Sequence, residues 1–107
     1  MLFSYYIMPK YKFSLLEYID SGKTLTVQQN LNITIDLINT LKLLHSLGYC
    51  HRDIKLENIM LSDKPTEFVP IIIDFSLSKP FLDDNEYHIA EDKTEELEGN
   101  VLYTSYN

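Results

Sequence analysis

Apolar side chains recur at every third or fourth position from Val27 to Leu44, which is the spacing of one face of an α-helix. The members of this apolar stripe are Val27, Leu31, Ile35, Ile38, Leu41 and Leu44. Thr26 and Gln29 indicate the helix start, because a hydroxyl and an amide three residues apart can form a capping box. Gly48 suits the residue just past a helix end, where φ becomes positive. The pattern therefore predicts a helix over residues 27–47 that buries the stripe in the core.

Shorter apolar runs on both sides of this helix predict β-strands. Residues 2–8 are dense in aromatic and aliphatic side chains up to Pro9, which indicates a short buried strand. Residues 59–61 and 69–73 are two further apolar runs, and the turn-forming residues between them favour a β-hairpin. A short helix is expected over residues 14–18. Together these elements predict the α+β class.

Charge and cysteine content restrict the partners and the cellular compartment that we expect for this chain. The chain of 107 residues carries a formal net charge of −7 and shows no cluster of Lys and Arg, so we expect neither a nucleic-acid surface nor a membrane surface. Its single cysteine, Cys50, excludes an internal disulfide and fits an intracellular location, in the cytoplasm, the nucleus or both. Eight acidic residues against one lysine between Asp83 and Glu98 predict an exposed loop.

The polar residues after the long helix form a distinctive pattern. Residues 51–58 read H-R-D-I-K-L-E-N, and Asp74 follows sixteen positions after Asn58 at the end of an apolar run. This arrangement resembles the protein-kinase catalytic loop, H-R-D-x-x-x-x-N, followed by a D-F-G-like motif. The lysine two residues after the aspartate is typical of Ser/Thr kinases. The resemblance therefore implies ATP-dependent phosphorylation of serine and threonine on protein substrates.

The same resemblance implies a role for each polar residue of the loop. Asp53 would accept a hydrogen bond from the substrate hydroxyl, and Lys55 would place positive charge on the γ-phosphate of bound ATP. Asn58 and Asp74 would supply an amide oxygen and a carboxylate to Mg²⁺, a hard cation that prefers oxygen ligands. ATP and Mg²⁺ are therefore the expected cofactors, with Asp53 and Lys55 as the expected catalytic residues.

Four stretches, HRDIKLENIM, IIIDFSLSKPF, HIAEDK and GNVLYTSYN, are similar in wording and order to the casein kinase I family. The resemblance covers nearly the whole chain. It implies the last strand of the N-terminal lobe and the hinge in residues 1–11, C-lobe helices, catalytic loop and metal-binding strand in 12–82, and the activation segment in 83–107. It also implies adenine-binding residues, with Met8 as gatekeeper, Pro9 offering a carbonyl and Tyr11 offering an N–H donor.

Three positions depart from the casein kinase I pattern. Ser76 replaces the D-F-G glycine and restricts the backbone, Asn100 replaces a threonine, and Leu102 replaces a basic residue. The 107 residues also contain no glycine-rich loop, no strand lysine with its partner glutamate, and no A-P-E motif. We therefore expect a partial kinase domain, from a truncated gene model or a partial sequence, that neither folds stably nor turns over ATP in isolation.

Two other functions stay open on the sequence. A pseudokinase or binding scaffold would keep the fold without turnover, and Ser76 and Asn100 favour this alternative. The intact catalytic and metal-binding residues oppose it. A small-molecule phosphotransferase with a kinase-like fold is disfavoured, because those enzymes tend to carry H-G-D in place of H-R-D and lack the lysine two residues on.

Several residues also have a plainer interpretation. Asp53 and Asn58 could be loop residues that form Asx-turns. His51 is expected to be structural and to pack beneath the loop. Arg52 would either clamp a phosphorylated activation loop or pair with a nearby acid. The acidic run over residues 83–98 is interpreted as a solvated face, with selection of basic substrates or self-inhibition as the alternative.

Overall fold

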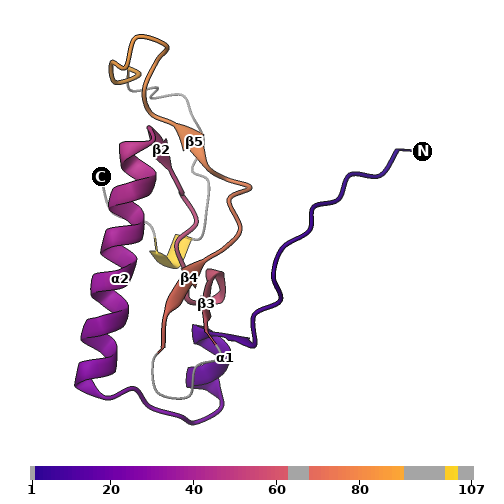
Figure 1. The fold of residues 1–107 in the computed structure, drawn as a ribbon, viewed down its shortest axis with the longest axis vertical. Helices are drawn as coiled ribbons and strands as arrows, with labels where there is room; N and C mark the ends of the chain where they lie inside the picture. The colour runs from indigo at the N-terminus through magenta and orange to yellow at the C-terminus, as the bar shows by residue number, and fades with distance from the viewer. Residues whose placement is uncertain (1, 63–67, 91–100, 104–107) are drawn as a thin grey trace.

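The computed structural model of this chain describes residues 2–62, 68–90 and 101–103, and they form an α+β arrangement (Figure 1). In Figure 1, the long helix α2 stands beside a small antiparallel sheet, and the short helix α1 lies near the lower end of that sheet. The elements in chain order are β1 (Phe13–Ser14), α1 (Leu15–Asp20), α2 (Val27–Ser46), β2 (Tyr49–Cys50), η1 (Leu56–Asn58), β3 (Ile59–Leu61), β4 (Pro70–Ile72), β5 (Lys79–Pro80) and η2 (Val101–Tyr103).

Helix α2 begins and ends close to the residues that the sequence predicts. Thr26 Oγ1 accepts a hydrogen bond from the Gln29 N–H at 3.1 Å, and Gln29 Oε1 accepts one from the Thr26 N–H at 2.9 Å, so the capping box is confirmed. At the other end Gly48 has φ of 86°. A Cβ atom at Gly48 would lie 3.2 Å from Leu82 Cδ1, so both backbone and space favour glycine.

Replacing Thr26 with alanine is expected to lower the free energy of unfolding by about 1 kcal/mol, because the first turn loses its side-chain acceptor. Urea denaturation followed by circular dichroism measures the change. Thr40→Ala is the matched control, since the Thr40 hydroxyl only donates to the Asp36 carbonyl on an exposed surface. Equal losses in the two variants would contradict the assigned cap.

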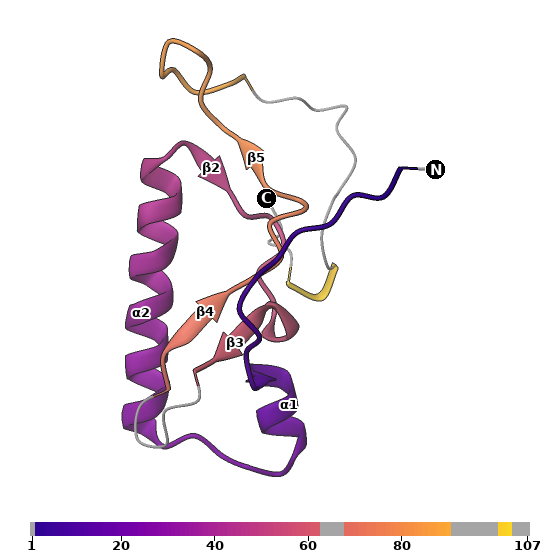
Figure 2. The same cartoon turned by 45° about the vertical axis from the view of Figure 1, so that its right-hand side comes forward.

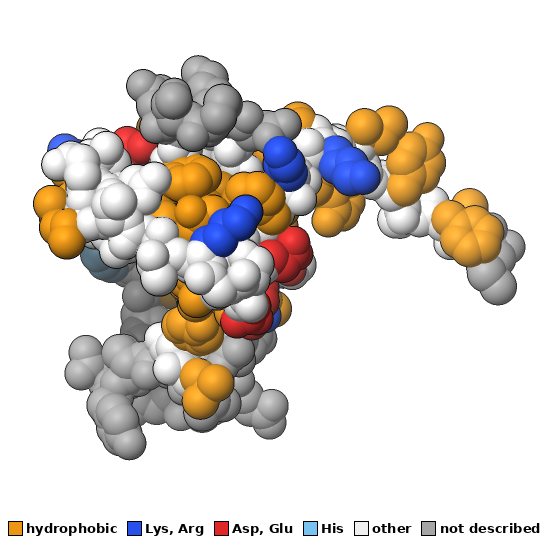
Figure 3. Space-filling view, turned by 90° about the horizontal axis from the view of Figure 1, so that it is seen from below, with side chains coloured by type: hydrophobic (Ala, Val, Ile, Leu, Met, Phe, Trp, Pro, Cys, Tyr) orange, Lys and Arg blue, Asp and Glu red, His pale blue; other side chains and the backbone are white. Residues whose placement is uncertain are grey.

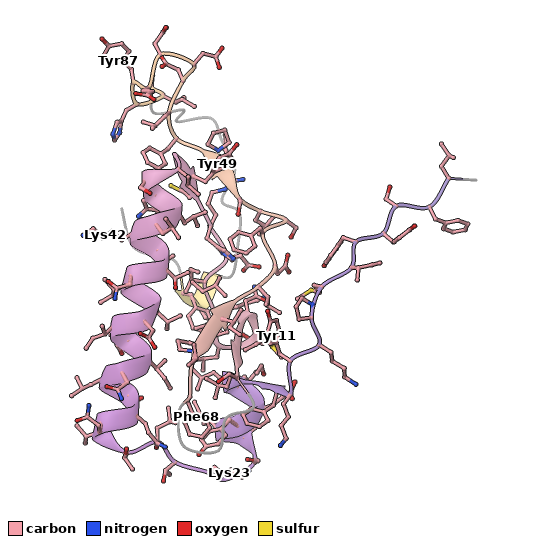
Figure 4. The ribbon with its side chains drawn as sticks, in the orientation of Figure 1. Tyr11, Lys23, Lys42, Tyr49, Phe68 and Tyr87 are labelled. Carbon is pink, nitrogen blue, oxygen red and sulfur yellow. The ribbon has the colours of Figure 1, made fainter. Side chains whose placement is uncertain are left out.

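The face of α2 that covers the sheet differs from the predicted one. Helix α2 packs against β4 and β2, and its buried residue is Ile33, with Leu37 partly buried in the same cluster. The first four members of the apolar stripe are exposed, from 52% to 77%: Val27, Leu31, Ile35 and Ile38. Lys42 points away from the sheet in Figure 4. The prediction that the stripe forms the core is therefore wrong for these four residues, because α2 carries apolar side chains on more than one side.

The predicted β-hairpin is confirmed, because β3 and β4 lie side by side as an antiparallel pair (Figure 2). They belong to a sheet with the strand order β1-β3-β4. Ile59 lies opposite Ile72, and Leu61 lies opposite Pro70. The predicted turn that joins these strands falls mostly on residues 63–67, which lie outside the described residues. One face of the sheet joins both helices in a core of Leu15, Ile33, Ile59 and Leu61.

The N-terminal segment is extended but is not the predicted buried strand. Its side chains are exposed, including Leu2 at 101% and Tyr5 at 85%. Figure 3 shows the segment as an arm that projects from the body and carries apolar side chains on its surface. A strand needs a neighbour for its backbone hydrogen bonds, and none of the described residues forms a ladder with residues 2–8.

The short strands β2 and β5 form a second antiparallel pair near the C-terminal end of α2. Beyond β5, residues 83–90 form an exposed loop, in agreement with part of the predicted acidic loop. The rest of that loop and Asn100 lie outside the described residues, whereas Leu102 lies in η2 and is exposed. Among the described residues, no helix combines the length and apolar character needed to cross a membrane.

Candidate active site

His51 connects the loop that precedes η1 with the segment that follows β4. Its side chain is 2% exposed. Its Nδ1 atom accepts a hydrogen bond from the Asp53 N–H at 3.1 Å, and Nε2 lies 3.0 Å from the Ile73 carbonyl oxygen. The two partners together require the proton on Nε2, which then donates to Ile73. The ring also contacts Phe75 edge-to-face, with centroids 4.9 Å apart. The structural role predicted for His51 is confirmed.

Asp53 and Asn58 form a buried hydrogen-bonded pair. Asn58 Nδ2 donates to the Asp53 carbonyl oxygen and to Asp53 Oδ2, each at 3.0 Å. Both side chains are buried, so each of these hydrogen bonds is electrostatically stronger than it would be in water. An Asx-turn would instead bond to the backbone two residues on. The pair therefore fixes the Asp53 carboxylate and leaves the Asn58 carbonyl oxygen, Oδ1, for another partner.

Lys55 lies beside this pair. Its Nζ atom is 3.8 Å from Asp53 Oδ1, and its side chain is partly exposed. The distance is that of a loose ion pair in a partly solvated place, which contributes little to stability. Its consequence is chemical, because the ammonium group of Lys55 stands next to the buried carboxylate of Asp53. The structure thus brings together Asp53, Lys55 and Asn58, as the sequence pattern predicts.

Asp74 is linked to the same loop through the backbone. The Ile73 N–H donates to the Asn58 carbonyl oxygen at 2.9 Å, which places Asp74 one residue beyond this contact. Asp74 itself is exposed and has φ of 58°, in the left-handed region. A residue other than glycine rarely adopts this conformation, and it costs on the order of 1 kcal/mol. Ser76 donates two hydrogen bonds to the Asp74 carboxylate.

The pKa of the Asp74 carboxyl is lowered from its usual value of 3.8. The largest cause is the hydrogen bond from the Ser76 hydroxyl, followed by the bond from the Ser76 N–H; partial burial opposes both, and attraction from Lys55 is a smaller cause. Because the folded-state pKa is depressed, the associated stability is present above the unfolded pKa. It is lost as pH falls through the folded pKa, below about pH 4.

Replacing Ser76 with alanine is expected to raise the pKa of Asp74 toward its usual value, because the strongest donor to the carboxylate is removed. The midpoint of the Asp74 carboxyl signal in an NMR titration measures the change. Ser78→Ala is the matched control, because the Ser78 hydroxyl has no hydrogen-bond partner among the described residues. An unchanged Asp74 midpoint would show that the hydroxyl bond is absent in solution.

A cavity of about 440 Å³ lies between the N-terminal segment and the end of β4. Figure 4 shows Tyr11 where the N-terminal segment meets the sheet. Most of the lining is aliphatic or aromatic, which suits a flat heteroaromatic ligand. The lining residues are Tyr6, Met8, Tyr11, Ile71, Ile72, Ile73, Asp74, Phe75 and Ser76. Of the predicted nucleotide-binding residues, Met8, Tyr11 and Asp74 line this cavity, whereas Pro9, Lys55 and Asn58 are not part of the lining.

Arg52 shows a feature that the sequence does not indicate. Its φ is 69°, and its Nε atom donates to the Leu77 carbonyl oxygen at 2.6 Å. The bond ties the catalytic loop to the segment after Asp74, so Arg52 contacts the backbone there in addition to any partner of its other nitrogens.

The sequence pattern also did not indicate that Tyr6 and Ile71 line the cavity. Both residues line the cavity because the extended N-terminal segment crosses the end of β4.

The oxygen atoms of Asn58 and Asp74 fit the requirements of Mg²⁺. Magnesium commonly binds one or two protein oxygens together with phosphate oxygens and water. Asn58 Oδ1 and the exposed Asp74 carboxylate are hard oxygen donors of this kind. Within the described ranges, no group of three His, Cys, Asp or Glu side chains could hold a metal ion by itself. The donor set therefore suits a metal that arrives with a phosphate ligand.

Comparison with known proteins agrees with this geometry. A sequence model of the protein kinase domain matches residues 3–105. The serine/threonine-protein kinase US3 homolog of Gallid herpesvirus 2 (strain GA) is 44% identical over 63 residues, which are 59% of this chain and 15% of that protein. The "Probable casein kinase I homolog" of Encephalitozoon cuniculi is 28% identical over 105 residues, 97% of this chain and 32% of that protein.

A third relative, the serine/threonine-protein kinase chk-2 of Caenorhabditis elegans, is 31% identical over 91 residues, which are 73% of this chain and 19% of that protein. The chain thus spans less than a third of the length of these three relatives. The family match, in contrast, extends over nearly all of its residues. On this match, together with the catalytic loop and the strand that leads to Asp74, the chain belongs to the protein kinase domain family.

Proposed function

We propose that this chain carries the catalytic loop and the metal-binding strand of a Ser/Thr protein kinase. The complete domain would transfer the γ-phosphate of ATP to serine or threonine hydroxyls of proteins. The observation that carries the proposal is the buried pair in which Asn58 Nδ2 holds Asp53, with Lys55 Nζ 3.8 Å from the same carboxylate. A base for the hydroxyl and a cation for the phosphate are thereby held next to each other.

In the proposed reaction, Asp53 accepts the hydrogen bond of the substrate hydroxyl and orients its oxygen for attack on the γ-phosphorus. A new oxygen–phosphorus bond forms, the bond to the β-phosphate oxygen breaks, ADP leaves, and the hydroxyl proton passes to the Asp53 carboxylate. Lys55 neutralises charge on the transferring group. Asn58 and Asp74 would hold Mg²⁺, which would neutralise negative charge on the phosphate oxygens. Met8, Pro9 and Tyr11 are the proposed adenine contacts, and the apolar lining of the cavity supports Met8 and Tyr11.

We further propose that the parent enzyme is similar to the casein kinase I family. The support is the order of the stretches HRDIKLENIM and IIIDFSLSKPF, together with the match of the Encephalitozoon cuniculi protein over 97% of this chain. An intracellular location in the cytoplasm, the nucleus or both is part of the same proposal. The 107 residues contain no glycine-rich loop, so we expect this chain alone to transfer phosphate slowly or not at all.

Binding of Mg²⁺-ATP to the complete kinase domain that contains these residues tests the nucleotide site. We expect Mg²⁺-ATP to raise the melting temperature of the wild type, because a ligand that binds only the folded state stabilises it. Asp74→Ala is expected to abolish the Mg²⁺-dependent part of the rise. Asp84→Ala is the matched control, since Asp84 is an exposed acid outside the cavity. A rise of equal size in all three proteins would contradict the assigned metal ligand.

Assays of phosphate transfer separate the kinase from the alternative of a pseudokinase. The complete domain that contains these residues is incubated with Mg²⁺-ATP and peptides that differ only in carrying serine, threonine or tyrosine. Transfer to serine and threonine peptides supports the proposal. Nucleotide binding without transfer to any peptide would instead support a binding scaffold that keeps the fold and has lost turnover.

A further inference from the structure

The Asp74 carboxylate receives two hydrogen bonds from a single residue. Ser76 Oγ donates to Asp74 Oδ1 at 2.6 Å, and the Ser76 N–H donates to the same oxygen at 3.2 Å. The hydroxyl bond is short, as expected for a donor facing an ionised acceptor. Both bonds end on Oδ1, which leaves Oδ2 as the carboxylate oxygen for a cation. The residue at the position of the D-F-G glycine thus contacts the metal-binding residue directly.

A serine fits at this position without backbone strain. Among the described residues, the non-glycine residues with positive φ are Arg52, Asp74 and Glu86, and Ser76 is not one of them. In this segment, the residue with the left-handed backbone conformation is Asp74, whose carboxylate accepts the hydrogen bond of the Ser76 hydroxyl. A glycine at this position could supply the N–H donor but not the hydroxyl, so the stronger of the two bonds depends on the serine side chain.

Packing does little to hold Asp74 in place. Asp74 is exposed, and the neighbouring Phe75 is 49% exposed. An exposed aspartate samples several side-chain rotamers, and a ligand that needs one of them must first suppress the others. Hydrogen bonds are therefore the main means by which this carboxylate can be oriented before a ligand arrives.

We propose that Ser76 is a positioning residue, whose hydroxyl fixes the Asp74 carboxylate in the orientation that binds the divalent cation of the nucleotide. The proposal rests on the proposed function, because it concerns the same metal site. It also changes the interpretation of Ser76 at the position where the family pattern has the D-F-G glycine. On this account, Ser76 strengthens the metal site of this chain, and its presence is no argument for a pseudokinase.

Three substitutions distinguish the effect of the Ser76 hydroxyl from the effect of backbone restriction at this position. Ser76→Ala removes the hydroxyl and keeps Cβ, Ser76→Gly removes both, and Ser76→Thr keeps the hydroxyl. If the hydroxyl orients Asp74, the alanine and glycine variants lose the effect and the threonine variant retains it. If only backbone restriction matters, the alanine variant behaves like the wild type. Ser78→Ala is the matched control, because Ser78 lies two residues on and its buried Oγ has no hydrogen-bond partner among the described residues.

The first measurement needs no metal and no activity. Three-bond NMR couplings of Asp74 report its χ1 rotamer in the metal-free form of the complete kinase domain that contains these residues. We expect one dominant rotamer in the wild type, Ser76→Thr and Ser78→Ala, and averaged couplings in Ser76→Ala and Ser76→Gly. Equal couplings in all five proteins would overturn the proposal, whatever the outcome of nucleotide binding. Because Ser76 is exposed, folding of the variants is checked by circular dichroism, and the glycine variant repeats the test should the alanine variant unfold.

The second measurement is Mn²⁺ binding in the presence of ATP, followed by electron paramagnetic resonance of free Mn²⁺. We expect Ser76→Ala to weaken Mn²⁺ affinity about tenfold, at the lower end of the effects of residues that orient metal ligands, because the N–H bond remains. Ser76→Thr is expected to stay within about twofold of the wild type, since the hydroxyl donor is kept. Equal Mn²⁺ affinity in the wild type and Ser76→Ala would overturn the positioning role.

The two measurements distinguish failure of this inference from failure of the proposed function. If the wild type binds no Mn²⁺-ATP although Ser76 orders Asp74, the metal-nucleotide site is wrong and the cation-positioning role falls with it. If the wild type binds Mn²⁺-ATP and loss of the hydroxyl changes neither the rotamer nor the affinity, the proposed function stands and the role of Ser76 is wrong.

Discussion

Asp53→Asn is expected to slow phosphate transfer to a serine peptide by about 10²- to 10⁴-fold, the range that general acid–base catalysis contributes. Asparagine keeps the size of the side chain but removes the negative charge that accepts the hydroxyl proton. It also removes the ion pair with Lys55. The rate is measured with the complete kinase domain that contains these 107 residues, at saturating Mg²⁺-ATP.

Nucleotide binding is the internal control for this variant. Asp53 is assigned to the substrate hydroxyl and not to the nucleotide, so the affinity for Mg²⁺-ATP is expected to change much less than the transfer rate. Asp36→Asn provides the matched substitution, because Asp36 lies exposed on α2 and outside the cavity lining. Transfer at the wild-type rate by Asp53→Asn, or an equal loss in both variants, would contradict the catalytic role of Asp53.

Leu61→Ala is expected to lower the free energy of unfolding by about 2–5 kcal/mol, the cost of deleting a buried leucine side chain. Leu61 is 0% exposed and lies at the centre of the core formed by β3, α1 and α2. Single small domains are stable by only about 5–15 kcal/mol, so this loss removes a large part of the total. Urea denaturation monitored by circular dichroism gives the value.

Leu43→Ala is the matched control for the core. Leu43 lies on α2 and is 64% exposed, so the same substitution there is expected to cost less than about 1 kcal/mol. Similar losses in the two variants would show that the core does not form as described. The wild-type measurement also tests the expectation that the isolated chain does not fold stably. A cooperative transition would contradict that expectation and would define both free-energy differences, whereas a broad transition would agree with it.

The elements that depend on residues close together along the chain were predictable from the sequence. The capping box of Thr26 and Gln29 and the positive φ of Gly48 define the ends of α2 through hydrogen bonds within a few residues. The hairpin of β3 and β4 follows from two apolar runs joined by turn residues. The pattern of residues 51–58 with Asp74 likewise identified the residues that surround the candidate site.

The face of α2 and the state of residues 2–8 were not predictable in this way. Helix α2 carries Val27 and Leu31 on one side and Ile33 and Leu37 on another, and periodicity alone cannot decide which side meets the sheet. The N-terminal segment has the composition of a strand, but a strand exists only with a partner. In both cases the outcome depends on what packs against the segment.

The sequence by itself determined the ends of α2, the hairpin and the identity of the polar residues in the catalytic loop, because these follow from local hydrogen bonding and from the order of side chains. Only the tertiary structure decided that Asn58 holds Asp53, that His51 bridges to Ile73, and that Ser76 holds Asp74. The hydroxyl contact joins residues only two positions apart, and it accompanies a positive φ at Asp74, two residues beyond β4. Such contacts depend on backbone conformations and packing that the whole fold imposes, and no pattern along the chain encodes them locally.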